Sequence, residues 1–312
     1  MTELAAGPVP GPRTGRIGRA LAERGADILP VTTVALLVIV IWYAAALLLN
    51  APQAIEQLAR KGVTDPAIAE LMAEAFAQRR PVLPTPDQVV VEIVTSSTER
   101  PVGNVRNLIT HVIATAQSTL AGFVLGSILG LGLAIGMAAL RPLERGVLPW
   151  IVASQTVPIL AIAPMVVVVL GNLGFTGLLP KAVISMYLCF FPVAIGMTKG
   201  LRSADPLHMD LMHSYNATPF QVFLKLRLPA ALPYLFASLK VAIAAALVGA
   251  IVGELPTGGQ AGLGTRLLAG SYYGQTTQIW AALIAASLLS ALLVQAVALA
   301  ERIVVRQSGG AR

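Results

Sequence analysis

Residues 210–236 read DLMHSYNATPFQVFLKLRLPAALPYLF, a polar and amphipathic insert between two long apolar runs. Thr218-Pro219-Phe220-Gln221 has the pattern of a capping box, in which the first and fourth residues satisfy each other's backbone N–H groups. This pattern predicts that a helix opens here. The apolar positions that follow recur at helical spacing, at Phe220, Phe223, Leu224 and Leu228.

A second short helix is predicted immediately before this one. Asp205-Pro206 combines a preferred N-cap residue with a proline at the first helical position, which predicts a helix over 207–215. Asn216 comes next, and asparagine tolerates the left-handed backbone conformation that often follows a helix. Two short helices that meet at an angle form a protruding elbow, a shape suited to insertion into a groove.

The rest of the chain is strongly apolar. Its 312 residues are 56% hydrophobic and 12% charged, with a mean hydropathy of +0.75, whereas soluble domains carry about 25% charged residues. Six segments reach the roughly 20 apolar residues that a helix needs to cross a bilayer. They are 30–50, 113–139, 147–170, 178–198, 233–254 and 278–300. The sequence therefore predicts an all-α integral membrane protein with six transmembrane helices, embedded in a lipid bilayer.

The basic residues set the expected orientation, because cytoplasmic loops are enriched in lysine and arginine. Both tails, 1–29 and 307–312, are predicted to be cytoplasmic, and so is the loop 199–232. The basic residues behind this prediction are Arg13, Arg16, Arg19, Arg24, Lys199, Arg202, Lys225, Arg227, Arg302 and Arg306. Since many of them flank apolar spans, the net charge of +7 does not indicate a nucleic-acid partner.

Residues 51–107 form a long outer connection between the first span, 30–50, and a membrane domain predicted for 108–306. Asp65-Pro66 and the capping box Thr85-Pro86-Asp87-Gln88 both predict helix starts. We expect two short helices here, at least one of them lying on the membrane surface. A small folded periplasmic domain is the alternative.

Motifs for catalysis are missing from the sequence. Neither a G-x-x-x-x-G-K-[ST] phosphate loop nor an H-E-x-x-H motif occurs. Cys189 is the single cysteine, which excludes a disulfide within the chain and a thiolate metal cluster. We therefore expect no catalytic residues, no cofactor and no metal site.

Three residues are candidates for a polar pathway through the membrane, where such groups are costly and often functional. Gln155 lies beside Pro158, which interrupts the helix and frees backbone carbonyls. The alternative for Gln155 is a hydrogen bond between helices. Glu254 ends the fifth span; its alternatives are an interfacial position or an ion pair with Arg266.

The elbow resembles the coupling loop of binding-protein-dependent ABC transporter permeases of the type I importer class. The family pattern is Glu-Ala-Ala, three residues, Gly, nine residues and Ile-x-Leu-Pro. Asp210 stands at the Glu position, Asn216 at the Gly position, and Leu226-Arg227-Leu228-Pro229 closes the pattern. Leu211 and Met212 replace the two alanines.

The resemblance covers roughly residues 80–305. Leu83-Pro84-Thr85-Pro86 stands where the family has Leu-Pro-Ser-Pro, and Gln155-Thr156-Val157-Pro158 is similar to a signature of nitrate/sulfonate/taurine-type permeases. Ser118 departs from the arginine of many relatives. Within this group the chain looks nearest to the riboflavin, thiamine-precursor and pyrimidine branch.

The resemblance implies a transmembrane permease subunit that forms the translocation pathway for a small organic solute or anion, with ATP hydrolysis in a separate subunit. Implied partners are ATP-binding subunits, a periplasmic or lipid-anchored solute-binding protein, and a second permease copy or paralogue. The implied location is the bacterial cytoplasmic (inner) membrane. The implied coupling loop spans 205–229, with ATPase-coupling residues Asp210, Leu211, Met212, Tyr215, Asn216, Ala217, Gln221, Leu228 and Pro229. The alternative function is a secondary, proton-coupled carrier.

Overall fold

The computed structural model describes residues 16–63, 65–257 and 261–307, with side chains from residue 29 to 305. Of the predicted tails, residues 1–15 and 308–312 lie outside the described residues, and so do residues 64 and 258–260. Every element in the described ranges is a helix, which confirms the all-α fold class. Five of these helices are long and apolar enough to cross a membrane, and a sixth crossing results if one bent pair counts as a span.

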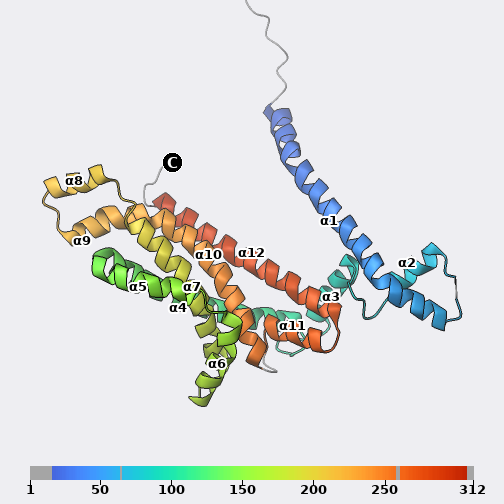
Figure 1. The fold of residues 1–312 in the computed structure, drawn as a ribbon. Coiled ribbons are helices and arrows are strands. Elements are labelled where there is room, and N and C mark those ends of the chain that lie inside the picture. The colour runs from blue at the N-terminus through green and yellow to red at the C-terminus, as the bar shows by residue number, and fades with distance from the viewer. Residues whose placement is uncertain (1–15, 64, 258–260, 308–312) are drawn as a thin grey trace, which may run out of the picture. The chain divides into compact units, whose positions relative to one another are not determined.

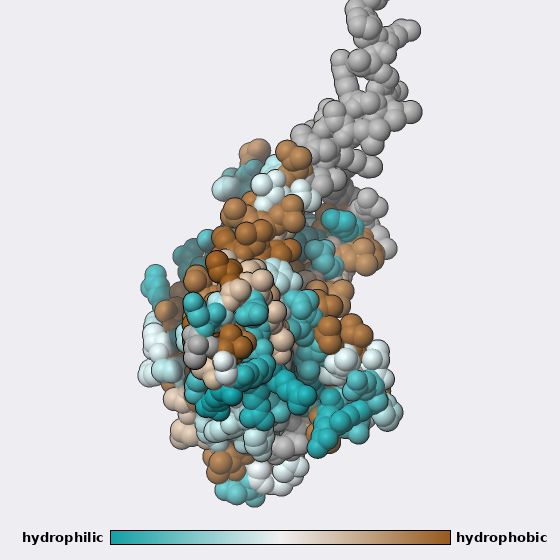
Figure 2. Space-filling model, turned by 90° about the vertical axis from the view of Figure 1, so that its right-hand side faces the viewer, coloured by the Kyte–Doolittle hydropathy of each residue, from teal (hydrophilic) through white to brown (hydrophobic). Residues whose placement is uncertain are grey.

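The chain divides into two compact units, 1–87 and 88–312. The first unit contains α1 (Arg16–Arg60) and α2 (Ile68–Phe76). The helix α1 extends ten residues beyond the predicted span 30–50, continues through Pro52, and ends at Arg60, just before Gly62 with its positive φ of 87°. The side chains of its apolar stretch are mostly exposed, as a lipid-facing helix requires. Figure 2 shows that many hydrophobic residues lie on the surface turned to the viewer, next to areas of hydrophilic residues.

Asn50 organises the interior of the first unit. Its Nδ2 donates to the Leu83 carbonyl at 2.9 Å, and its Oδ1 accepts from the Val82 backbone N–H at 2.8 Å. The helix α2 begins at Ile68 with Ala67 as its N-cap, so the predicted start at Asp65-Pro66 is wrong. A carboxyl from Glu70 satisfies the Ala67 backbone N–H instead, at 3.3 Å.

The second unit is built around α7 (Leu178–Leu201), which packs against both α4 (Leu108–Ala139) and α10 (Leu228–Glu254). Its core holds fully buried small and medium side chains, with Cys189 among them. Helices α4 and α7 approach closely at the glycines of α4. A Cβ atom on Gly126 would lie 2.8 Å from the Cβ of Cys189. This spacing is the close packing that the glycine pattern of α4 favours in lipid.

The helix α12 (Thr276–Gln307) packs against α10 and α11 (Leu263–Tyr272). The short α3 (Pro86–Thr98) precedes α4, and in Figure 1 the second unit's α11 lies at the opposite end of α10 from α8 and α9. The second unit therefore has two distinct ends, and each carries a cluster of polar groups.

The structure does not form the predicted span 147–170 as one continuous helix. It is divided between α5 (Arg141–Ser154) and α6 (Ile159–Asn172), which are bent by 97° at the break. Pro158 is the N-cap of α6, and a proline both removes a backbone donor and disfavours a helical residue before it. The break therefore follows from the sequence at 155–158.

Candidate functional site

The elbow begins with α8 (Pro206–Ser214), and its start is capped as the sequence predicts. The Asp205 carboxylate accepts from the Leu207 backbone N–H at 2.9 Å. Asn216 follows the helix with φ of 50°, in the left-handed region, as predicted for its position. The Ala217 backbone N–H closes the turn by donating to the Met212 carbonyl at 3.0 Å.

The second arm of the elbow starts at α9 (Pro219–Val222). Its predicted capping box is present: Gln221 Oε1 accepts from the Thr218 backbone N–H at 2.9 Å, and Thr218 Oγ1 accepts from the Gln221 backbone N–H at 3.4 Å. A π-helical segment, Phe223–Arg227, then leads directly into α10. Leu228-Pro229 opens α10, and the Leu228 backbone N–H donates to the Phe223 carbonyl five residues back, so the helix is continuous across this junction.

Most side chains of the elbow are exposed. No residue of α8 is buried. Leu211 is 52% exposed, Tyr215 76% and Phe220 69%, whereas Met212 and Ala217 are half-buried. Large apolar side chains grouped on a protruding element are typical of a surface that a partner covers.

An ion pair supports the base of the elbow. Both terminal nitrogens of Arg202, at the end of α7, bond to the carboxylate of Glu144 in α5. Arg202 also donates to the Met137 carbonyl at 3.3 Å, so three helices are joined at this point. The sequence did not predict this contact, because Glu144 and Arg202 are separated by 58 positions and no local pattern relates them.

The predicted pathway residues Gln155 and Pro158 both lie at the bend between α5 and α6. Gln155 is half-buried, and its Nε2 donates to the neighbouring Ser154 hydroxyl at 3.3 Å. The Tyr187 hydroxyl of α7 donates to the Ser154 carbonyl, which the bend has released from the helix. A polar bend within an apolar helix pair is an arrangement that can line a cavity in a membrane protein.

Glu254 lies at the other end of α10 and is fully buried. One carboxylate oxygen accepts from Thr115 Oγ1 at 2.8 Å, and the other accepts from the Gly264 backbone N–H at 2.8 Å. Thr115 in turn accepts from the Leu263 backbone N–H at 2.8 Å. Glu254 therefore holds the start of α11 against α4, since a buried carboxylate requires such partners. The pairing with Arg266 that was considered for it is wrong, because Arg266 pairs with Glu92.

His111 fastens the same loop to α4. Its Nε2 lies 2.7 Å from the Val105 carbonyl, and its Nδ1 lies 3.0 Å from the Gly262 backbone N–H. Gly262 has no room for a side chain, because a Cβ atom there would lie 2.6 Å from Glu254 Oε2. Sequence reasoning found Glu254 but not its partners, which are Thr115 of α4, 139 positions away, and the Gly264 backbone N–H at the start of α11.

Arg266 pairs with a different carboxylate. Its Nη2 donates to Glu92 of α3 at 3.1 Å, and its Nη1 donates to the Arg106 carbonyl at 3.1 Å. The side chain is 3% exposed, and its Nε–H has no acceptor among the described residues. Burial lowers the pKa of Arg266, and the nearby Glu92 carboxylate counteracts that shift. An unpaired buried donor costs about 1–3 kcal/mol.

Comparisons with known proteins agree with one another. Residues 122–308 match the protein family described as "Binding-protein-dependent transport system inner membrane component". The chain is 34% identical over 174 residues to a "Probable ABC transporter permease protein" of Haemophilus influenzae, which covers 56% of this chain and 69% of the relative. It is 33% identical over 183 residues to the "Formylaminopyrimidine transport permease protein ThiX" of Halalkalibacterium halodurans, covering 59% of this chain and 68% of that one.

A third relative is the "Riboflavin transport system permease protein RibX" of Chloroflexus aurantiacus, 31% identical over 196 residues, with 63% of this chain and 71% of the relative covered. Among solved structures, a chain of the MetNI methionine ABC transporter in inward-facing conformations aligns with a TM-score of 0.51 and 21% identity. That alignment covers 64% of this chain and 95% of the MetNI chain, so the two share a fold.

Proposed function

The chain belongs to the family of binding-protein-dependent transport system inner membrane components, and on this premise we propose that its α8–α9 elbow is the surface through which a separate ATP-binding subunit drives transport. The chain is a non-catalytic permease subunit of an ABC importer, so its ATPase activity lies in a partner subunit. The proposal concerns which part of this chain the ATPase contacts.

The exposed apolar surface of the elbow carries the proposal. Leu207, Leu211, Tyr215 and Phe220 are all more than half exposed at one end of the bundle. The charge at Asp210 is exposed as well, and its carboxylate has no hydrogen bond or ion pair in the described part of the chain. An apolar patch with one unpaired charge is suited to a groove that supplies matching apolar and basic groups.

The connection from the elbow to the membrane is continuous. The arm α9 runs through the π-helical segment into α10 without an intervening loop, so a displacement of the elbow is transmitted along α10. Asn216 and the capping box at Thr218 and Gln221 fix the angle between the two arms. We assign the elbow the role of a lever that changes the side on which the translocation cavity opens.

The remaining assignments follow from the premise and the sequence. The solute is a small organic molecule or anion, delivered by a periplasmic or lipid-anchored binding protein to a pore made with a second permease copy or paralogue. The membrane is the bacterial inner membrane, with both chain termini and the elbow in the cytoplasm. Gln155 and Pro158 are proposed to line the pathway at the helix bend, whereas the contacts of Glu254 support a role in positioning the outer loop.

A proton-coupled carrier is not favoured, because the chain belongs to a family whose members work with binding proteins and ATP-binding subunits. The family membership also accounts for the elbow, which a carrier does not require.

Purification of the full complex tests the elbow assignment. The tagged chain is solubilised from its native membrane as wild type, as Asp210→Arg, and as Asp65→Arg, a control with the same charge change at an exposed site in the first unit. We expect wild type and control to retain an ATP-binding protein and ATPase activity, and Asp210→Arg to lose most of both. Equal retention by all three would place the ATPase contact elsewhere.

A further inference from the structure

A cavity of about 750 Å³ lies at the end of the second unit that is remote from the elbow. Its walls come from α3, from residues 105–106 just before α4, from α11, and from residues 273–278 at the start of α12. No role in the proposed function uses this cavity. Most of its lining side chains are polar or charged, so it is not a gap in hydrophobic packing.

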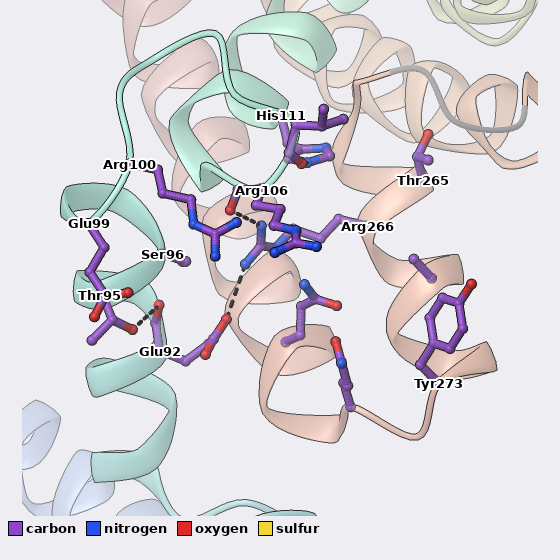
Figure 3. A pocket seen from close by; sticks show the side chains of 14 residues that line it. Glu92, Thr95, Ser96, Glu99, Arg100, Arg106, His111, Thr265, Arg266 and Tyr273 are labelled. Carbon is purple, nitrogen blue, oxygen red and sulfur yellow. Dashed lines mark hydrogen bonds and ion pairs between the residues drawn. The ribbon is translucent and has the colours of Figure 1, made fainter.

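Three arginines dominate the cavity. Figure 3 shows the side chains of Arg100, Arg106 and Arg266 directed toward one another. Two carboxylates, Glu92 and Glu99, also line the cavity, which leaves one positive charge in excess. Glu92 already pairs with Arg266, and neither Arg100 nor Arg106 has an ion pair in the part of the chain that the structure describes. Like charges that face one cavity repel each other unless an anion lies between them.

The buried guanidinium of Arg266 points to the same chemistry. The Nη1 and Nη2 atoms of Arg266 both have acceptors, whereas its Nε–H has none in the described ranges. The side chain is only 3% exposed, so water does not readily supply the missing acceptor. Buried polar groups are nearly always paired, so an unpaired donor on a side chain that lines the cavity is unusual. An oxygen anion fits best, because the planar guanidinium matches two oxygens of a carboxylate or phosphate group.

The position of the cavity indicates two sources for such an anion. The first turns of α4 and α12, two membrane spans, form part of its wall. Two tyrosines, Tyr272 and Tyr273, are 79% and 69% exposed beside it. Exposed tyrosines at the ends of membrane helices are typical of the level of the lipid headgroups. A basic pocket at that level is accessible both to the phosphate of a lipid and to anions from solution.

We propose that this cavity is a binding site for an oxyanion, a phosphate or carboxylate group held by Arg100, Arg106 and Arg266. The group is carried by an anionic lipid headgroup or by a free solute. The site is independent of the elbow, so it stands or falls separately from the ATPase contact.

The test uses the full chain with Arg100→Gln and Arg106→Gln combined. Neither side chain has an ion pair among the described residues; Arg100 is half-buried and Arg106 is exposed. The double variant therefore keeps the contact between Arg266 and Glu92, and we expect it to fold. Arg79→Gln combined with Arg80→Gln is the control, because it makes the same charge change at two exposed arginines in the first unit. Native mass spectrometry counts bound phosphatidylglycerol against phosphatidylcholine, and thermal unfolding is followed in inorganic phosphate against sodium chloride of equal ionic strength.

We expect the cavity variant to bind its anion at least tenfold more weakly than wild type, and the control variant to bind it like wild type. A loss confined to phosphatidylglycerol identifies the lipid as the source, and a loss of phosphate stabilisation identifies a free anion. If wild type prefers neither anion, or if the control loses as much binding as the cavity variant, the site does not exist.

Discussion

The close approach of α4 and α7 predicts that an alanine at Gly126 destabilises the protein, and the distances in the structure indicate by how much. A Cβ atom on Gly126 would lie 2.8 Å from the Cβ of Cys189 and 2.9 Å from the Met186 carbonyl oxygen. Carbon atoms in contact prefer about 3.5–4.0 Å, so Gly126→Ala forces the two helices apart. Gly132 is on the same helix, is exposed, and has no atom within 4 Å of the corresponding Cβ position.

Gly126→Ala and Gly132→Ala therefore form a matched pair. Both gain the helix propensity of alanine, which is worth roughly 1 kcal/mol, so that effect cancels between them. Overpacking in a tight interface costs about 1–3 kcal/mol, and we expect Gly126→Ala to be less stable than Gly132→Ala by that amount. For a unit of this size the difference corresponds to a midpoint lower by about 2–12 °C.

Thermal unfolding of the two variants and wild type, purified in the same detergent, measures this difference. Gly132→Ala should unfold at or above the wild-type midpoint, and Gly126→Ala should unfold below that of Gly132→Ala. A Gly126→Ala protein as stable as Gly132→Ala would show that α4 and α7 are not as closely packed as described.

Two further changes test the ends of the second unit. Thr115→Val removes the hydroxyl that bonds both Glu254 and the Leu263 backbone N–H, so each buried group loses a partner and the midpoint should fall by the equivalent of about 1–3 kcal/mol per group. Thr218→Ala removes one half of the capping box with Gln221 and should weaken α9 by about 1 kcal/mol, seen as faster amide hydrogen exchange over 219–223 with an unchanged unfolding midpoint.

Each of these changes has a matched control. Thr156→Val removes an exposed hydroxyl that donates only locally, to the Ala153 carbonyl three residues before it. Ser214→Ala removes a hydroxyl that donates to the Asp210 carbonyl within α8. If Thr156→Val lowered the midpoint as much as Thr115→Val, the buried network would not hold the outer loop. If Ser214→Ala accelerated exchange over 219–223 as much as Thr218→Ala, the capping box would not stabilise α9.

The features that the sequence predicted well are local. The two arms of the elbow, the cap at Asp205, the left-handed Asn216 and the capping box at Thr218 all depend on residues within a few positions of one another. Local hydrogen bonds of this kind leave a recognisable pattern in the chain. The all-α membrane fold is likewise predicted by the length of the apolar runs.

The features that the sequence did not reveal depend on distant contacts. The pair of Arg202 with Glu144, and the partners of Glu254 in α4, bring together residues that no single helix pattern relates. Asp65-Pro66 was a strong local signal for a helix start that Ala67 and Glu70 fulfil instead, since a helix boundary can shift by a few residues at little cost.

Site-directed cross-linking tests the central claim, that the elbow is the ATPase contact. Cys189 is the single cysteine and is fully buried, so a cysteine added at the surface is the reactive one. Tyr215→Cys places it on the elbow, where the native side chain is 76% exposed, and Tyr272→Cys places it at the opposite end, where the exposure is 79%.

Both variants are labelled in native membranes with a thiol-reactive photo-cross-linker, and the adducts are identified by mass spectrometry. We predict that Tyr215→Cys is joined to an ATP-binding protein and that Tyr272→Cys is not. An ATP-binding protein joined to Tyr272→Cys, or absent from Tyr215→Cys, would contradict the account.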